Sequence, residues 1–180
     1  MLQLIKGWKG KPSHPPLTDA TIGAYTVGVA MLVVGKLGLQ SPQMAVGALI
    51  AISGGLIFAA PTAITGLLDW LDIPKGTPVR TTATVHLVTM VTATVLFALT
   101  WLAQRPGYVD EEIRTLALVL GLVAEVVLAS GGYLGGAIVF VYGHRVVKRP
   151  ETPVADALVP GRLESREPAQ PAAPPHAPPP

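Results

Sequence analysis

The chain has 180 residues, of which 50% are hydrophobic and only 13% are charged, and its mean hydropathy is +0.51. Soluble globular domains carry about 25% charged residues, so this composition indicates an integral membrane protein. A formal net charge of +2 argues against a nucleic-acid partner. The lack of cysteine excludes disulfides, thiolate metal sites and covalently attached haem.

The first 17 residues predict a basic segment at the membrane interface. Apolar side chains alternate there with Lys6, Lys9 and Lys11, whose ammonium groups would meet anionic lipid head groups. No continuous apolar run precedes the proline-rich stretch that follows, so the sequence predicts no cleavable signal peptide. Thr18 is the predicted N-cap of the first long helix.

Four apolar stretches predict four membrane-spanning helices. Each exceeds the roughly 20 residues that a helix needs to cross the hydrocarbon core, and they cover about 18–39, 44–68, 81–102 and 113–142. Short connections favour antiparallel neighbours, so we expect an all-α, up-down-up-down four-helix transmembrane bundle over 18–146. The final segment, 147–180, is rich in proline and alanine and predicts a disordered tail.

The distribution of lysine and arginine predicts which way the bundle faces. With both termini in the cytoplasm, ten basic residues lie inside and three lie outside. Positive residues are enriched in cytoplasmic loops. The sequence therefore favours a multi-pass protein of the cytoplasmic membrane with both ends inside the cell.

Span four contains two overlapping glycine pairs, and both have the four-residue spacing that lets helices approach closely. The four residues are Gly131, Gly132, Gly135 and Gly136. The sequence favours packing within the bundle over a seam between two copies of the chain, and it leaves a homo-oligomer open.

Four motifs, taken together, resemble a known family. They are SHPPLTD followed by IGAYTVG, TGLLDW at the end of span two, His86 alone in span three, and SGGYLGGAIVFVYGHRV at the end of span four. In this order they resemble a bacterial family of four-helix membrane proteins of unknown function. Its members read HP-x-L-x-x-x-x-IG, then G-L-L-D-W, then an in-membrane histidine, then GG-x-LGG-x-x-V-Y, and the resemblance covers about residues 10 to 146.

The resemblance implies membrane redox chemistry, because some relatives are fused to Rieske-type or cytochrome domains. By position, the polar signature of the family falls on His14, Asp69 and His86. The chain departs from the family pattern twice. Lys11 stands where many members have a first histidine, and the histidine that follows the last span is displaced to His144, which weakens a ligand role.

The polar signature predicts a cluster at the cytoplasmic end of the bundle. His86 follows Arg80 by six residues, which places it about 9 Å into its helix. An ionisable group at that depth indicates a functional site. One interpretation is purely structural: His86 donates to Asp19 or Asp69, and Arg80 pairs with Asp69.

Two other interpretations give these residues a chemical role. In one, His14 and His86 are the axial ligands of a b-type haem, as in helix bundles that build cofactor sites from facing side chains. In the other, His86 together with Asp19 or Asp69 binds a metal ion or relays protons.

Glu125 lies near the middle of span four, apart from this cluster. A carboxyl group at that depth must be protonated or hydrogen-bonded, and the predicted partners are Thr92, Thr94 and Ser53. The sequence favours a neutral, buried, hydrogen-bonding acid over a proton carrier.

The chain contains no nucleophile elbow, phosphate loop or zinc-protease motif, so it predicts no enzyme. We therefore expect an accessory or scaffold protein embedded in the lipid bilayer. The alternatives are a haem-binding electron carrier that works with membrane redox proteins, and a protein that handles protons or metal ions.

Overall fold

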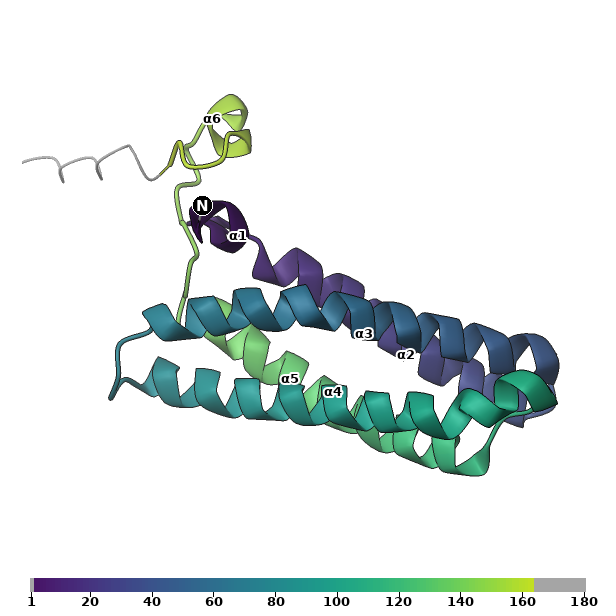
Figure 1. The fold of residues 1–180 in the computed structure, drawn as a ribbon. Helices are drawn as coiled ribbons and strands as arrows, with labels where there is room; N and C mark the ends of the chain where they lie inside the picture. Colours follow the sequence, from purple (N-terminus) through teal and green to yellow (C-terminus); the bar gives the residue numbers. More distant parts are fainter. Residues whose placement is uncertain (1, 164–180) are drawn as a thin grey trace, which may run out of the picture.

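The computed structural model describes residues 2–163, and predictions that concern 164–180 lie outside these residues. Within the described part, four long helices dominate: α2 (His14–Lys36), α3 (Ser41–Asp72), α4 (Pro78–Asp110) and α5 (Thr115–Phe140). Each is long and apolar enough to cross a membrane. The predicted all-α, four-helix class is therefore confirmed (Figure 1).

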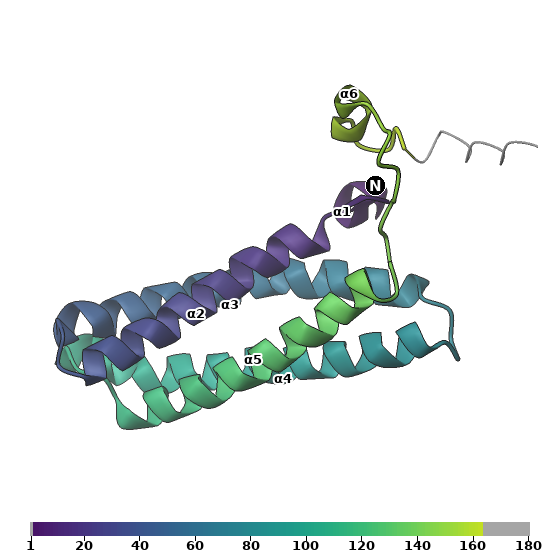
Figure 2. The ribbon, with the colours of Figure 1, turned by 180° about the vertical axis from the view of Figure 1, so that it is seen from behind.

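Consecutive long helices run in opposite directions and form two hairpins (Figure 1). α2 packs most closely against α3, and α4 against α5, while smaller contacts join α3 to α4 and α2 to α5. The helices thus follow the cyclic order α2, α3, α4, α5. α3 and α4 lie in front in Figure 1, and α2 and α5 lie in front in Figure 2. In this order α2 and α4 are parallel and stand diagonally across the bundle.

The first long helix begins earlier than predicted. α2 starts at His14 rather than at Thr18, because Pro15 and Pro16 fall in the first turn, where backbone N–H groups have no partner within the helix. Thr18 instead donates its hydroxyl to the carbonyl oxygen of His14 at 2.9 Å. This earlier start places His14 inside the helix rather than in the segment before it.

α3 and α4 also continue beyond their apolar stretches. They have 32 and 33 residues, which corresponds to roughly 48–50 Å of helix, whereas the hydrocarbon core of a bilayer is about 30 Å thick. Their terminal turns must therefore reach the head-group region. The predicted limits at residues 68 and 102 mark the end of apolar sequence, not the end of the helix.

A small module lies beside one end of the bundle. It consists of α1 (Leu2–Lys6) and an antiparallel ladder in which β1 (Gly7–Trp8) pairs with β2 (Lys11–Pro12). α6 (Val154–Leu158) lies near α1 in both views (Figures 1 and 2), and Gly161 approaches the indole of Trp8. α6 falls within the segment that the sequence predicts as a tail.

Two aromatic rings form the centre of the core. Tyr25 of α2 and Phe97 of α4 are completely buried and stack face to face, with ring centroids 3.9 Å apart. Tyr25 lies directly on Gly55 of α3, where a Cβ atom would overlap its ring. Many large aliphatic side chains are exposed on the outer faces of the helices, as expected for a bundle surrounded by lipid.

Polar contacts close the end of the bundle that lies opposite the small module. Gln104 of α4 is fully buried; its amide group donates to the carbonyl oxygen of Glu112 at 3.0 Å and accepts from the backbone N–H of Arg114 at 3.2 Å. Lys36, at the end of α2, donates to the carbonyl oxygen of Ile113 at 3.2 Å. These bonds provide partners for backbone groups in the connection between α4 and α5. They also explain why α4 continues past its apolar stretch.

Candidate functional site

His14 opens α2 and places its imidazole against α3. Its Nδ1 atom lies 3.0 Å from the carbonyl oxygen of Thr62 and 3.4 Å from the hydroxyl of Thr65. Because a carbonyl oxygen only accepts, Nδ1 carries the proton and Nε2 keeps its lone pair. The ring lies on Gly66, where a Cβ atom would come within 2.6 Å of the imidazole Cε1 atom.

His86 makes the equivalent contacts between α4 and α5. Its Nδ1 atom lies 2.9 Å from the carbonyl oxygen of Gly131, so its proton is also on Nδ1. A Cβ atom at Gly135 would lie 3.1 Å from Cε1 of this ring. In both halves, the carbonyl and the glycine are four residues apart, so a single turn of the partner helix holds each imidazole.

The two imidazoles meet across the bundle. Their centroids are 6.5 Å apart and their planes are nearly perpendicular, at 87°. The Thr18 hydroxyl oxygen is 3.5 Å from Nε2 of His14, but its proton is donated to the carbonyl oxygen of the same histidine. The pair therefore brings together two imidazoles whose Nε2 atoms are unprotonated, with 6.5 Å between the ring centroids.

The first helices of the two hairpins repeat each other around this pair. His86 follows His14 by 72 residues, and Phe97 follows Tyr25 by the same interval. The imidazole contact and the aromatic stack are thus both contacts between equivalent positions of the two halves. An approximate two-fold axis along the bundle passes through both.

The second helices of the hairpins follow the same relation. Gly131 follows Thr62 by 69 residues, and Gly135 follows Gly66 by the same interval. These are the residues that hold the two imidazoles. The histidine site is therefore built by the same local structure twice, once from each hairpin.

Two histidines are too few for an ordinary protein metal site. Across residues 2–163, no three His, Cys, Asp or Glu side chains are grouped so that they could hold a metal ion. A structural zinc ion takes four protein ligands and a catalytic one takes three. His14 and His86 alone therefore do not form such a site.

Asp69 and Arg145 form an ion pair at the end of the bundle where the small module lies. Nη1 of Arg145 donates to Oδ1 of Asp69 at 2.8 Å, and the two side chains are only 13% and 12% exposed. Nη2 donates to the carbonyl oxygens of Lys6 at 3.2 Å and Gly7 at 2.7 Å. The backbone N–H of Gly10 donates to the Arg145 carbonyl oxygen at 2.8 Å. We call these five residues the arginine latch, because they tie α3 and the small module to the segment after α5.

The sequence predicts that Arg80 pairs with Asp69, but in the structure it does not. The end of α3 offers Arg80 other acceptors. Its Nη1 atom donates to the carbonyl oxygens of Trp70 and, at 3.0 Å, of Ile73. The guanidinium also lies 3.4 Å from the centroid of the Trp70 ring. The last carbonyl groups of a helix have no N–H donor within that helix, and Arg80 supplies a donor to them. Asp69 pairs with Arg145 instead.

The other members of the predicted polar cluster are also apart. His86 is bonded to Gly131 on α5 rather than to either carboxylate, and Asp19 is exposed on α2. The structure thus brings His14 and His86 together, but it does not assemble the predicted set of Asp19, Asp69, Arg80 and His86.

His144 lies in the electrostatic neighbourhood of the arginine latch. Burial lowers the pKa of His144 below its ordinary value of 6.5, and the nearby carboxylate of Asp69 opposes this shift. Its Nε2 atom is buried and, among the atoms described, has no hydrogen-bond partner. Burial therefore favours the neutral form of this imidazole at the edge of the latch.

The four glycines of α5 divide between two faces. Gly131 and Gly135 face α4, and a Cβ atom at Gly131 would overlap the side chain of Met90. Cβ atoms at Gly132 and Gly136 would meet no neighbouring helix. The first pair therefore provides close packing within the bundle, and the second pair does not.

The contact between Gly66 and His14 predicts a selective effect of one methyl group. We expect Gly66→Ala to displace the imidazole and to lower stability by about 1–3 kcal/mol, the usual cost of overpacking. Gly54→Ala on the same helix is the matched control, because nothing lies within 4 Å of its Cβ position. Thermal unfolding in detergent measures both variants, and equal shifts in Tm would contradict the close contact.

Two features of this site were missed in the sequence. Arg145 counted only as one of the basic residues, since no local pattern links it to Asp69, which lies 76 residues earlier. The repeat was visible as the constant interval that relates His14 to His86 and Tyr25 to Phe97. A search for internal repeats would have revealed that interval.

Comparison with known proteins places the chain in a family. The family model described as Predicted membrane protein (DUF2231) matches residues 10–148. No curated protein and no solved structure matches the chain. The matched region contains all four long helices, both histidines of the pair and Arg145. The chain therefore belongs to the DUF2231 family of predicted membrane proteins.

Proposed function

We propose that the protein binds one b-type haem through His14 and His86 and carries electrons in the membrane. The observation that carries this proposal is the placement of the two imidazoles, with centroids 6.5 Å apart and each Nδ1 atom hydrogen-bonded to a backbone carbonyl. His14 and His86 would be the two residues that hold the haem iron, one from each hairpin. The observed spacing suits two ligands of one iron.

Haem suits the pair better than a bare metal ion does. A haem would bring nitrogen ligands of its own, so the protein would need to supply only His14 and His86. A zinc ion would need a third or fourth protein ligand, and the described residues group no such set. When bound, haem supplies a one-electron redox centre.

The chain itself holds two ring nitrogens in the form that binds iron. The carbonyl oxygens of Thr62 and Gly131 accept the Nδ1 protons, which orients the rings and leaves each Nε2 atom as the electron-pair donor. Gly66 and Gly135 allow the rings to lie close to their partner helices. One turn of helix in each hairpin thus sets both the tautomer and the position of its imidazole.

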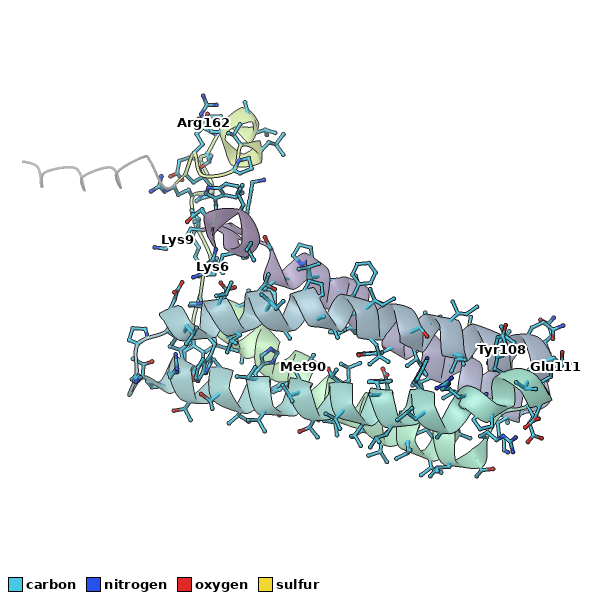
Figure 3. The ribbon with its side chains drawn as sticks, in the orientation of Figure 1. Lys6, Lys9, Met90, Tyr108, Glu111 and Arg162 are labelled. Carbon is cyan, nitrogen blue, oxygen red and sulfur yellow. The ribbon has the colours of Figure 1, made fainter. Side chains whose placement is uncertain are left out.

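We infer that the bundle lies in a bacterial cytoplasmic membrane with both ends of the chain inside the cell. Lys6 and Lys9 lie at one end of the molecule and Glu111 lies at the other (Figure 3). Positive residues are retained on the cytoplasmic side of a membrane. In this orientation the histidine pair lies toward the inner leaflet, where membrane redox proteins could exchange electrons with it.

The accessory or scaffold role expected from the sequence is the second candidate. The arginine latch favours it, because the latch joins distant parts of the chain without any ligand. Handling of protons or metal ions by His86 with Asp19 or Asp69 has less support, since the bond of His86 goes to Gly131. A scaffold without a cofactor has no visible absorption, so one measurement separates the first two candidates.

Reduced-minus-oxidised visible spectra of the protein in mild detergent test haem binding. We expect a sharp α band in the wild type and loss of that band in His14→Ala and in His86→Ala, because each variant lacks one axial ligand. His144→Ala is the matched control, since it removes a histidine outside the pair and should retain the band.

Three results would contradict the haem proposal. The first is a featureless spectrum from folded wild-type protein expressed with ample haem, which would favour the scaffold. The second is a band that survives both substitutions in the pair. The third is a band lost equally in His144→Ala, which would place the haem elsewhere.

A further inference from the structure

Glu125 lies near the middle of α5 and bonds to α2. Its Oε1 atom accepts a hydrogen bond from the hydroxyl of Thr26 at 2.8 Å. Its other oxygen, Oε2, is buried and has no hydrogen-bond partner among the described residues. The partner is thus on α2, whereas the sequence predicted Thr92, Thr94 or Ser53; those three hydroxyls donate to carbonyl oxygens of their own helices.

Thr26 uses its hydroxyl in a way that is unusual for this bundle. Most hydroxyls in the long helices donate to the carbonyl oxygen four residues earlier, the common solution for threonine in a membrane. The group includes Thr18, Thr21, Thr62, Thr84, Thr89, Thr92, Thr94 and Thr100. Thr26 instead donates across the seam between α2 and α5. Its hydroxyl is bonded to the Glu125 carboxyl group and not to a carbonyl oxygen of its own helix.

The other hairpin does not repeat the residue types of this pair. The approximate two-fold axis relates Thr26 to Ala98 on α4 and Glu125 to Leu56 on α3, by the same intervals of 72 and 69 residues. The seam between α3 and α4 therefore has two apolar side chains where the seam between α2 and α5 has a hydroxyl and an acid. The seam between α3 and α4 instead has a neutral hydrogen bond of its own, from the indole Nε1 atom of Trp101 to the hydroxyl of Ser53 at 2.8 Å, so an equivalent seam is joined without an acid.

Within the described part of the chain, no cation balances Glu125. Among residues 2–163, none of the ion pairs includes it. The other ionisable groups in the middle parts of the helices around it are Tyr25 on α2, His86 on α4 and Tyr133 on α5, and none of them forms a hydrogen bond with it. An ionised carboxylate at bilayer depth costs several kcal/mol. A metal cation would need more oxygen ligands than one carboxyl and one hydroxyl supply, whereas a proton needs only Oε2.

We propose that Glu125 and Thr26 form a proton-binding site in the middle of the bundle, at the seam between α2 and α5. The carboxyl group takes up and releases one proton, and the Thr26 hydroxyl holds its other oxygen in both states. Thr26 is exposed on the outer surface of the helices, which makes the site accessible from the apolar phase. The site does not involve the histidine pair, and it stands whether or not haem binds there.

A hydrophobic carbodiimide tests the proposal on the full-length protein in detergent. The reagent reacts with a protonated carboxyl group in apolar surroundings: the acid adds across one C=N bond, its proton passes to nitrogen, and nothing leaves. We expect peptide mapping to find one added reagent molecule at Glu125 and none at the exposed acids Asp72 and Glu111. Because only the protonated acid reacts, labelling should weaken as the pH is raised.

Three variants separate a proton site from a structural acid. Glu125→Gln should lose the label. Thr26→Val removes the hydrogen bond to Oε1 but leaves the carboxyl group in place, so the label should be retained. The double variant Thr26→Ala, Glu125→Leu carries the residues of the equivalent seam, and it should fold and remain unlabelled.

Four outcomes would overturn the proposal, and none depends on the visible spectrum that tests haem binding. The first is a folded wild type that takes up no reagent, and the second is labelling that is unchanged in Glu125→Gln. The other two concern sodium and the double variant. Protection by sodium at constant pH would assign the site to a metal cation. Failure of the double variant to fold would show that the acid is structural.

Discussion

Replacing Arg145 by alanine is expected to destabilise the protein by about 3–5 kcal/mol, the usual cost of removing one partner of a buried ion pair. The substitution leaves Asp69, only 12% exposed, without its cation, and it removes the donors to the carbonyl oxygens of Lys6 and Gly7. Arg145→Lys should restore only part of the loss, because an ammonium group cannot reproduce the planar fork of the guanidinium. Unfolding by heat or by SDS in detergent micelles would measure these differences.

A second substitution distinguishes the lost pairing from lost packing. Asp69→Asn combined with Arg145→Ala should recover part of the free energy of unfolding, since a neutral amide leaves no buried charge. Lys148→Ala removes an exposed cation nearby in the chain and should change stability by no more than about 0.5 kcal/mol. An Arg145→Ala variant as stable as this control would mean that the latch does not hold this end of the bundle.

Phe97→Ala is expected to cost about 3 kcal/mol. Phe97 is completely buried and stacks on Tyr25 at 3.9 Å. In a membrane, the transfer contribution is small because lipid is as apolar as the core, so the loss comes from the cavity and from missing dispersion contacts. We therefore expect the lower end of the range for truncating an aromatic residue, measured as a fall in Tm in detergent.

Phe140→Ala is the matched control for this truncation. Phe140 is 85% exposed near the end of α5, so its loss opens no cavity and should change stability by no more than about 0.5 kcal/mol. Similar losses from both phenylalanines would show that the stacked rings add nothing beyond general apolar contact.

Apolar stretches located the four helices, but they did not locate the helix ends. A helix satisfies its own backbone groups in lipid, so long apolar runs suffice to predict the spans. Prolines usually mark a helix boundary, but they are tolerated in the first turn of a helix. This is why α2 can start at His14, directly before two prolines. The end of α4 depends on Gln104, whose bonds to the following loop are tertiary contacts that no local pattern shows.

His86 was singled out because ionisable groups at membrane depth are rare and costly, and His14 was singled out by the resemblance to the family. That they face each other depends on the order and rotation of the helices, which apolar periodicity does not specify. The expected partner of Asp69 was the nearby Arg80, yet the guanidinium that reaches it belongs to Arg145, whose φ of 58° is left-handed. Local spacing thus identified ionisable residues better than it identified their partners.

The two-fold relation between the hairpins also bears on how such a protein could arise. Because each half supplies one imidazole and one aromatic ring to the shared axis, a single hairpin that associated with its own copy would already contain both facing pairs. In that ancestor every substitution would appear twice. Gene duplication and fusion remove this constraint. An acid with a hydroxyl on one seam, and leucine with alanine on the other, is a difference that two identical hairpins cannot encode.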